Sequence, residues 1–215
     1  MKRRTIDLVV SVGGLLLAGL LLIAGLVLTS NANFANTYVA EQLAQQKISF
    51  KTADTLTDQE KTKACLVEYA GQPMTTGKQA ECYANNFIGL HLEGIAGGKT
   101  YAELGDVQSQ LRAQVAEAQK SNAANVADLQ KQLTDTTAAR ETVFKGETLR
   151  GLLLTSYGFS EFGNKAGQAA TVAYLASGLL FILAIFGFIH ALLTPKTQAF
   201  AAPDVATAGR EQVRA

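Results

Sequence analysis

The sequence predicts an all-α protein in which two transmembrane helices flank a helical extracytoplasmic domain with one disulfide. Three features of the 215 residues predict this fold: two uncharged apolar runs at 8–28 and 166–189, a stretch at 106–145 without Gly or Pro, and two cysteines. Each run reaches the about 20 residues that a helix needs to cross a bilayer core. The composition, 48% apolar and 17% charged, therefore averages unlike segments. It excludes a single soluble globule, an all-β domain and a disordered chain.

Basic residues set the expected orientation. Lys2, Arg3 and Arg4 precede the first run and Lys196 follows the second, whereas Lys47 is the first basic residue after the first run. The positive-inside rule then places both termini in the cytoplasm and the middle outside a bacterial plasma membrane. The middle is nearly neutral, which gives no reason to expect nucleic acid as a partner.

The expected segments follow from these boundaries. They are a cytoplasmic N-terminus at 1–7, transmembrane helices at 8–29 and 166–193, an extracytoplasmic domain at 30–165 and a cytoplasmic tail at 194–215. A cleaved signal peptide is the alternative for the first run, because Ser30-Asn31-Ala32 resembles a cleavage site. Secretory apolar cores usually have about 7–15 residues, so the longer run favours an uncleaved anchor.

Cys65 and Cys82 are expected to join two helices of a hairpin at 57–96. A capping box starting at Thr57 opens a helix to about Ala70, and Thr75 or Thr76 can open a second helix to about Ala96. A turn near Pro73 brings the cysteines to similar heights, where a disulfide is feasible and export would preserve it. Two free buried thiols are the alternative to a disulfide. A zinc site is not expected, because it needs more ligands than Cys65, Cys82 and His91 supply.

Beyond Gly97-Gly98, a second capping box begins at Thr100 and opens the stretch 101–145. This stretch fits either one long helix or two antiparallel helices that turn near Asn122. Its apolar residues repeat at 3–4 spacing and form a seam that serves either internal packing or a partner. The candidate seam residues are Leu104, Val107, Leu111, Val115, Val126, Leu129 and Leu133.

The regions that border the two spans carry aromatic and apolar residues. The first span is expected to continue outward as a helix with a stripe of Phe34, Tyr38, Val39 and Leu43. The apolar patch 147–159 is expected to lie on the outer leaflet or to pack against the cysteine hairpin. After this patch, a loop containing Gly158, Gly163 and Gly167 is expected before the second span.

Small residues within the two spans predict close helix packing, because they let helices approach each other in lipid. The spans are expected to pair with each other or with other subunits. The predicted packing residues are Gly14, Ala18, Ala166, Ala169, Ala173 and Ser177.

No catalytic motif stands out in the sequence. Gly97-Gly98-Lys99-Thr100 resembles the end of a phosphate-binding loop, but residue 92 is Leu where the upstream Gly is required. His91 and His190 are the only histidines, one for each side of the membrane. We therefore expect no enzymatic activity, no catalytic residue, no metal site and no cofactor.

Two segments resemble a family of small actinobacterial membrane proteins with two spans around an exported segment. They are Gly97-Gly98-Lys99-Thr100-Tyr101-Ala102-Glu103-Leu104 and Phe144-Lys145-Gly146-Glu147-Thr148-Leu149-Arg150. Members often carry the name "aromatic ring-opening dioxygenase". Such an oxygenase needs a metal held by several His or carboxylate ligands, which this sequence does not supply, so no functional residue is transferred.

The expected function is that of a non-enzymatic membrane protein whose outer helical domain is an interaction module, such as an accessory subunit of a larger complex. Its expected partners are the lipid bilayer and other membrane proteins or further copies of itself. The alternatives are an envelope sensor that signals through a partner and a small oligomeric channel. The tail after Lys196 is short for an output domain, which disfavours the sensor.

Overall fold

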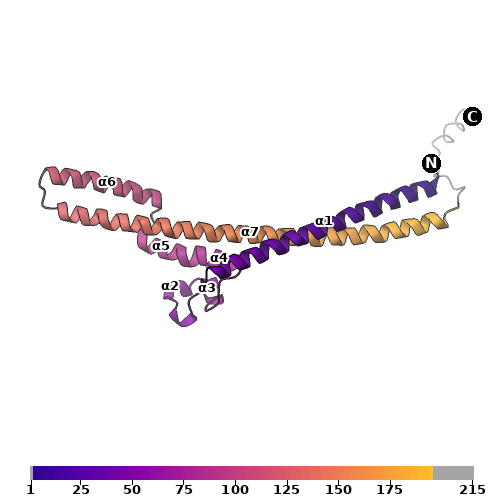
Figure 1. Ribbon diagram of the computed structural model, residues 1–215, viewed down its shortest axis with the longest axis horizontal. Helices are drawn as coiled ribbons and strands as arrows, with labels where there is room; N and C mark the ends of the chain where they lie inside the picture. Colours follow the sequence, from indigo (N-terminus) through magenta and orange to yellow (C-terminus); the bar gives the residue numbers. More distant parts are fainter. Residues whose placement is uncertain (1, 196–215) are drawn as a thin grey trace, which may run out of the picture. The chain divides into compact units, whose positions relative to one another are not determined.

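The computed structural model describes residues 2–195 (Figure 1). Met1 and residues 196–215, which include Lys196 and most of the predicted cytoplasmic tail, lie outside the described residues. Internal contacts divide the described residues into two units: 2–31 with 165–195 form unit 1, and Ala32–Asn164 form unit 2. The regular structure of residues 2–195 is helical without strands, which confirms the predicted all-α class.

Two helices, α1 (Arg3–Gln45) and α7 (Val126–Leu193), contribute to both units. Each contains a stretch that is long and apolar enough to cross a membrane by length and composition. The predicted loop around Gly158, Gly163 and Gly167 is wrong, because α7 runs through all three positions. Close packing explains the glycine at 163, where a Cβ atom would lie 2.8 Å from the Cβ of Ala35.

Unit 1 consists of the apolar parts of α1 and α7, which lie antiparallel. The hydroxyl oxygens of Thr29 and Tyr174 are 2.9 Å apart, and the Ser177 hydroxyl donates a 2.8 Å hydrogen bond to the carbonyl oxygen of Ala18. Nearer the N-terminus, Nδ1 of His190 lies 3.0 Å from Oδ2 of Asp7. The pairing of early α1 residues with late α7 residues shows the antiparallel register.

In unit 2, the hairpin that carries the cysteines is built from short helices. Its first arm contains α2 (Asp58–Lys61) and α3 (Ala64–Glu68). Its second arm contains α4 (Gly77–Cys82), the π-helix η2 (Tyr83–Ile88) and α5 (Gly89–Ala96).

The expected single helix from Thr57 to Ala70 is wrong, because Lys63 has an extended backbone that separates α2 from α3. The Thr62 hydroxyl donates to the carbonyl oxygen of Gln59, a local bond that competes with the continuing helix. Before this arm, a 3₁₀ turn η1 (Ala53–Thr55) follows Ser49, which forms an isolated antiparallel bridge with Pro73.

Local signals in the sequence mark the starts of three helices and the end of one. Capping boxes are present at Thr57, Thr76 and Thr100, where each threonine side chain accepts from the backbone amide three residues on. Helix α5 ends at Gly97, whose φ of 58° is left-handed, a conformation that glycine adopts without a Cβ penalty. These positions agree with the boundaries read from the sequence.

The stretch 101–145 forms a helical hairpin rather than one helix. Helix α6 (Tyr101–Lys120) ends before a turn in which Asn122 has a φ of 51°, and α7 begins at Val126. Figure 1 shows α6 beside the first part of α7. The Gln108 side-chain amide donates a 2.7 Å hydrogen bond to the Thr137 hydroxyl across this hairpin.

Candidate functional site

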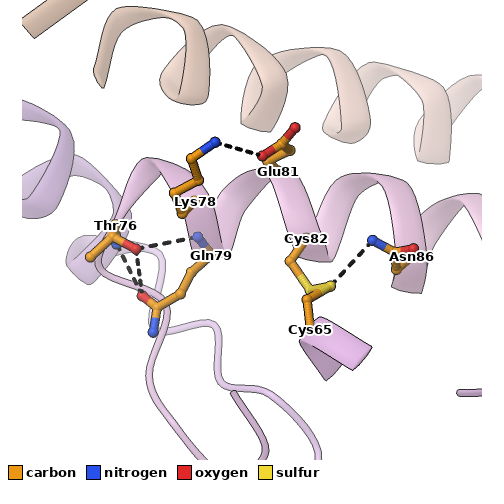
Figure 2. Close-up of a disulfide and its surroundings, with 7 residues drawn as sticks. All are labelled: Cys65, Thr76, Lys78, Gln79, Glu81, Cys82 and Asn86. Atoms are coloured by element: carbon orange, nitrogen blue, oxygen red, sulfur yellow. Dashed lines mark hydrogen bonds and ion pairs between the residues drawn. A yellow bond between two sulfur atoms is a disulfide. The ribbon is translucent and has the colours of Figure 1, made fainter. Parts of the chain in front are cut away.

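The predicted disulfide is present and joins the two arms of the hairpin (Figure 2). Cys65 lies at the start of α3 and Cys82 at the end of α4, with their Cα atoms 6.1 Å apart. The side-chain amide of Asn86 donates to Sγ of Cys65 at 3.2 Å. The crosslink therefore fixes α3 against the helix that continues into η2.

The disulfide borders a core of large apolar side chains. Leu66 and Met74 are almost fully buried, and Phe50 packs against the ring of Tyr83 at 5.4 Å between ring centroids. Helix α7 contributes Val143 and Leu153 to this core. The patch 147–159 thus supplies Leu153 and the partly buried Leu154, which pack with the cysteine hairpin, as one of the two sequence interpretations expected.

A buried carboxylate, Glu60, lies beside this core. Nζ of Lys51 is 2.8 Å from Oε1 and 3.1 Å from Oε2, and the backbone amide of Thr57 donates to Oε2 at 2.7 Å. Nε2 of His91 lies 3.7 Å from Oε1. Burial acts to raise the pKa of Glu60, but the hydrogen bonds from Lys51 and Thr57 outweigh it and leave this pKa below its ordinary value. The capping box was visible in the sequence, whereas the partnership with Lys51 was not.

A polar pocket of about 280 Å³ lies between the cysteine hairpin and α7 in unit 2. Three cationic side chains line it: Lys63 from the start of α3, Lys99 from the loop after α5, and Arg150 from α7. The remaining lining residues are Asn85, Gly89, Leu90, Leu92, Glu93, Gly98, Thr100, Val143 and Glu147.

Arg150 is the most constrained of the three cations. Its Nη1 donates to Glu147 at 3.2 and 3.3 Å, and its Nη2 donates to Oδ1 of Asn85 at 3.3 Å. Its buried Nε has no hydrogen-bond partner among residues 2–195. Asn85 belongs to the π-helix η2, a feature frequent at functional sites.

Both segments that carry the family resemblance line this pocket. Gly98, Lys99 and Thr100 come from the first segment, and Glu147 and Arg150 come from the second. No pattern in the sequence indicates that these two segments meet.

An apolar groove of about 450 Å³ lies between the outer part of α1 and α7, also in unit 2. All five of the following residues line it: Val39, Leu43 and Leu153 are buried, whereas Tyr38 and Leu152 remain 47% and 63% exposed. The predicted stripe on α1 therefore divides. Its aliphatic members are buried, and its aromatic members stay exposed and pack on Phe159, with the Phe34 and Tyr38 ring centroids 6.4 and 6.0 Å away.

The packing residues predicted for the spans lie mostly along the contact within unit 1. Ala18, Ala173 and Ser177 are buried there, and a Cβ atom at Gly14 would lie 3.8 Å from that of Ala184. Ala166 is half-buried, whereas Ala169 is exposed and its neighbour Ala170 is buried.

The predicted seam residues lie within the α6–α7 hairpin. Leu104, Leu111 and Val115 are buried on α6. The other four seam residues are half-buried: Val107, Val126, Leu129 and Leu133. The seam is thus covered to a large extent by the two helices that carry it.

The residues described contain no group of three or more His, Cys, Asp or Glu side chains that could hold a metal ion. Comparisons with protein-family models, curated proteins and solved structures find no match to this chain. The pocket, the groove and the disulfide core must therefore be interpreted from their own chemistry.

Proposed function

We propose that this chain is a two-span protein of a bacterial plasma membrane, with both termini in the cytoplasm and residues 30–165 outside. Two observations support the membrane location. Helices α1 and α7 each contain an apolar stretch of spanning length, and large side chains such as Leu16, Leu175 and Phe186 are more than 60% exposed. The disulfide suits an oxidising compartment outside the cytoplasm.

Thiol labelling in intact cells tests this orientation, because both native cysteines are held in the disulfide. We expect a membrane-impermeant maleimide to label an exposed Gln130→Cys variant in intact cells. The matched Thr5→Cys variant should react only after the cells are permeabilised. Labelling with the opposite pattern would reverse the proposed topology, and equal labelling of both variants before permeabilisation would contradict a spanning protein.

We further propose that the outer domain is a non-enzymatic interaction module, an accessory subunit that holds an apolar helix of a membrane partner in the α1–α7 groove. The observation that carries this proposal is the exposed apolar lining of the groove, with Leu149, Leu152 and Phe159 at helical spacing on α7. Helical partners dock through apolar side chains at such spacing. Along the chain, the groove residues follow soon after the first apolar run and precede the second, so a partner that also crosses the membrane can reach them.

Site-specific photo-crosslinking in the native membrane tests the groove. A photoreactive residue at Leu152 should give an adduct with one discrete membrane protein. The same residue at Gln130, an exposed position on α7 outside the groove, should give none. An adduct only with lipid or only with a second copy of this chain would contradict the accessory-subunit proposal, as would equal adducts at both positions.

A further inference from the structure

The polar pocket combines positive charge with incomplete pairing. Lys63 and Lys99 each have no carboxylate within ion-pair distance in the structure of residues 2–195. Arg150 shares its charge with Glu147, yet the nitrogen–oxygen distances of 3.2 Å and more are long for a charge-assisted bond. Two free ammonium groups and a loosely paired guanidinium thus border one cavity.

These groups favour a particular class of ligand. Lysine and arginine present only donors, and the fork of arginine matches the oxygens of a carboxylate or a phosphate. The second carboxylate, Glu93, does not balance the three cations, and the volume of about 280 Å³ admits only a small molecule. An apolar ligand would leave the charged groups of the pocket without partners.

We propose that this pocket binds a small oxyanion, a carboxylate or phosphate group, through Arg150, Lys63 and Lys99. Asn85 and Glu147 hold the guanidinium of Arg150 toward the cavity, and Glu147 competes with the ligand for it. The site is separate from the apolar groove and does not depend on the function proposed for that groove.

Because Glu147 competes with the ligand for Arg150, substitutions at these two positions should change anion affinity in opposite directions. We expect inorganic phosphate or succinate to bind the detergent-solubilised full chain saturably, measured by calorimetry at constant ionic strength. Glu147→Gln should tighten binding several-fold, because it frees the guanidinium. Arg150→Gln should weaken binding more than tenfold, the effect of losing a hydrogen bond to a charged group. If Arg150 were only a structural link, Glu147→Gln would not tighten binding.

Variants at Lys63 and Lys99 test the site independently of whether Arg150→Gln folds. Lys63→Gln and Lys99→Gln should each weaken binding about threefold, as expected for partly exposed charges. Lys120→Gln is the control, because Lys120 is exposed, pairs with Glu117 and does not line the pocket. Absence of saturable binding to either anion, or equal effects of all three lysine variants, would overturn the proposal.

A second arm identifies the source of the oxyanion. The chain is placed in phosphatidylcholine nanodiscs with or without phosphatidylglycerol, and phosphate binding is measured again. Weaker phosphate binding in the anionic nanodiscs would assign the site to a lipid headgroup. Unchanged binding would assign it to a soluble anion.

Discussion

The two units of this chain differ in the kind of side chain that packs inside each of them. In unit 1, the buried residues of the described segments are all small: Ser11, Ala18, Gly25, Ala170, Ala173, Ser177, Ala184, Ala191 and Thr194. In unit 2, the core is built from large residues such as Phe50, Leu66 and Met74, and a disulfide crosslinks it. Most leucines of unit 1, in contrast, are exposed, and the others are half-buried.

The contrast follows from the surroundings proposed for each unit, which are lipid for unit 1 and water for unit 2. In water, burial of large apolar side chains drives folding, at about 25 cal/mol per Å² of apolar surface. In lipid that drive is absent between helices, and association depends on close approach and hydrogen bonds. The Ser177–Ala18 and Thr29–Tyr174 hydrogen bonds of unit 1 are contacts of this second kind.

The largest effect is expected from removing the disulfide of unit 2. Cys65→Ser should lower the local unfolding free energy of α4 and α5 by about 3 kcal/mol, because the crosslink restricts the unfolded chain over a short loop. Amide hydrogen exchange of the full chain under oxidising conditions measures this loss. After reduction, the variant and the natural protein should exchange alike. An equal difference in both states would mean that side-chain packing, and not the crosslink, causes the loss.

A smaller effect is expected from Glu60→Gln. The change removes the charge that accepts hydrogen bonds from Lys51 and Thr57, and a hydrogen bond to a charged group contributes about 2 kcal/mol. Hydrogen exchange at pH 7 should show a loss of this size in the cysteine hairpin. Glu68→Gln, at an exposed position on α3, is the matched control and should change little.

The pH dependence gives Glu60 a second test. Its pKa in the folded chain lies below the ordinary glutamate value, so the unfolded chain binds the proton more readily. The stability that Glu60 contributes is therefore complete above the unfolded pKa and is lost as the pH falls through the folded pKa. As the pH falls from 7 to 3, the Glu60→Gln variant should lose less unfolding free energy than the natural protein. An unchanged profile would assign the acid sensitivity to other carboxylates.

How much the sequence predicts depends on how local each feature is. The capping boxes at Thr57, Thr76 and Thr100 were predictable because three neighbouring residues complete each one. The disulfide was predictable because Pro73 sets a turn midway between the cysteines. The break after Thr62 was missed, since a side-chain bond to Gln59 competes with a helix that composition alone allows.

Features that join distant parts of the chain were not predictable. Gly163 fits a loop by its residue type, but it lies in a helix, at a point where Ala35 leaves no room for a side chain. The pocket joins Lys63, Lys99 and Arg150 from positions far apart in the sequence. No local pattern indicates that three such cations share a cavity.

The smallest effect is expected within unit 1, where close approach of the helices matters most. A Cβ atom at Gly25 would lie 2.5 Å from Cε1 of Tyr174, whereas one at Gly19 meets nothing within 4 Å. Gly25→Ala should push the Tyr174 ring away from Thr29 and lose their hydrogen bond, which costs about 1 kcal/mol. Gly19→Ala makes the same chemical change on the same helix without this contact and should not destabilise the pair. Thermal unfolding of both variants in detergent, followed by circular dichroism, measures the difference. If the two variants unfolded alike, close packing at Gly25 would not stabilise unit 1, and the contrast with unit 2 would lose its support.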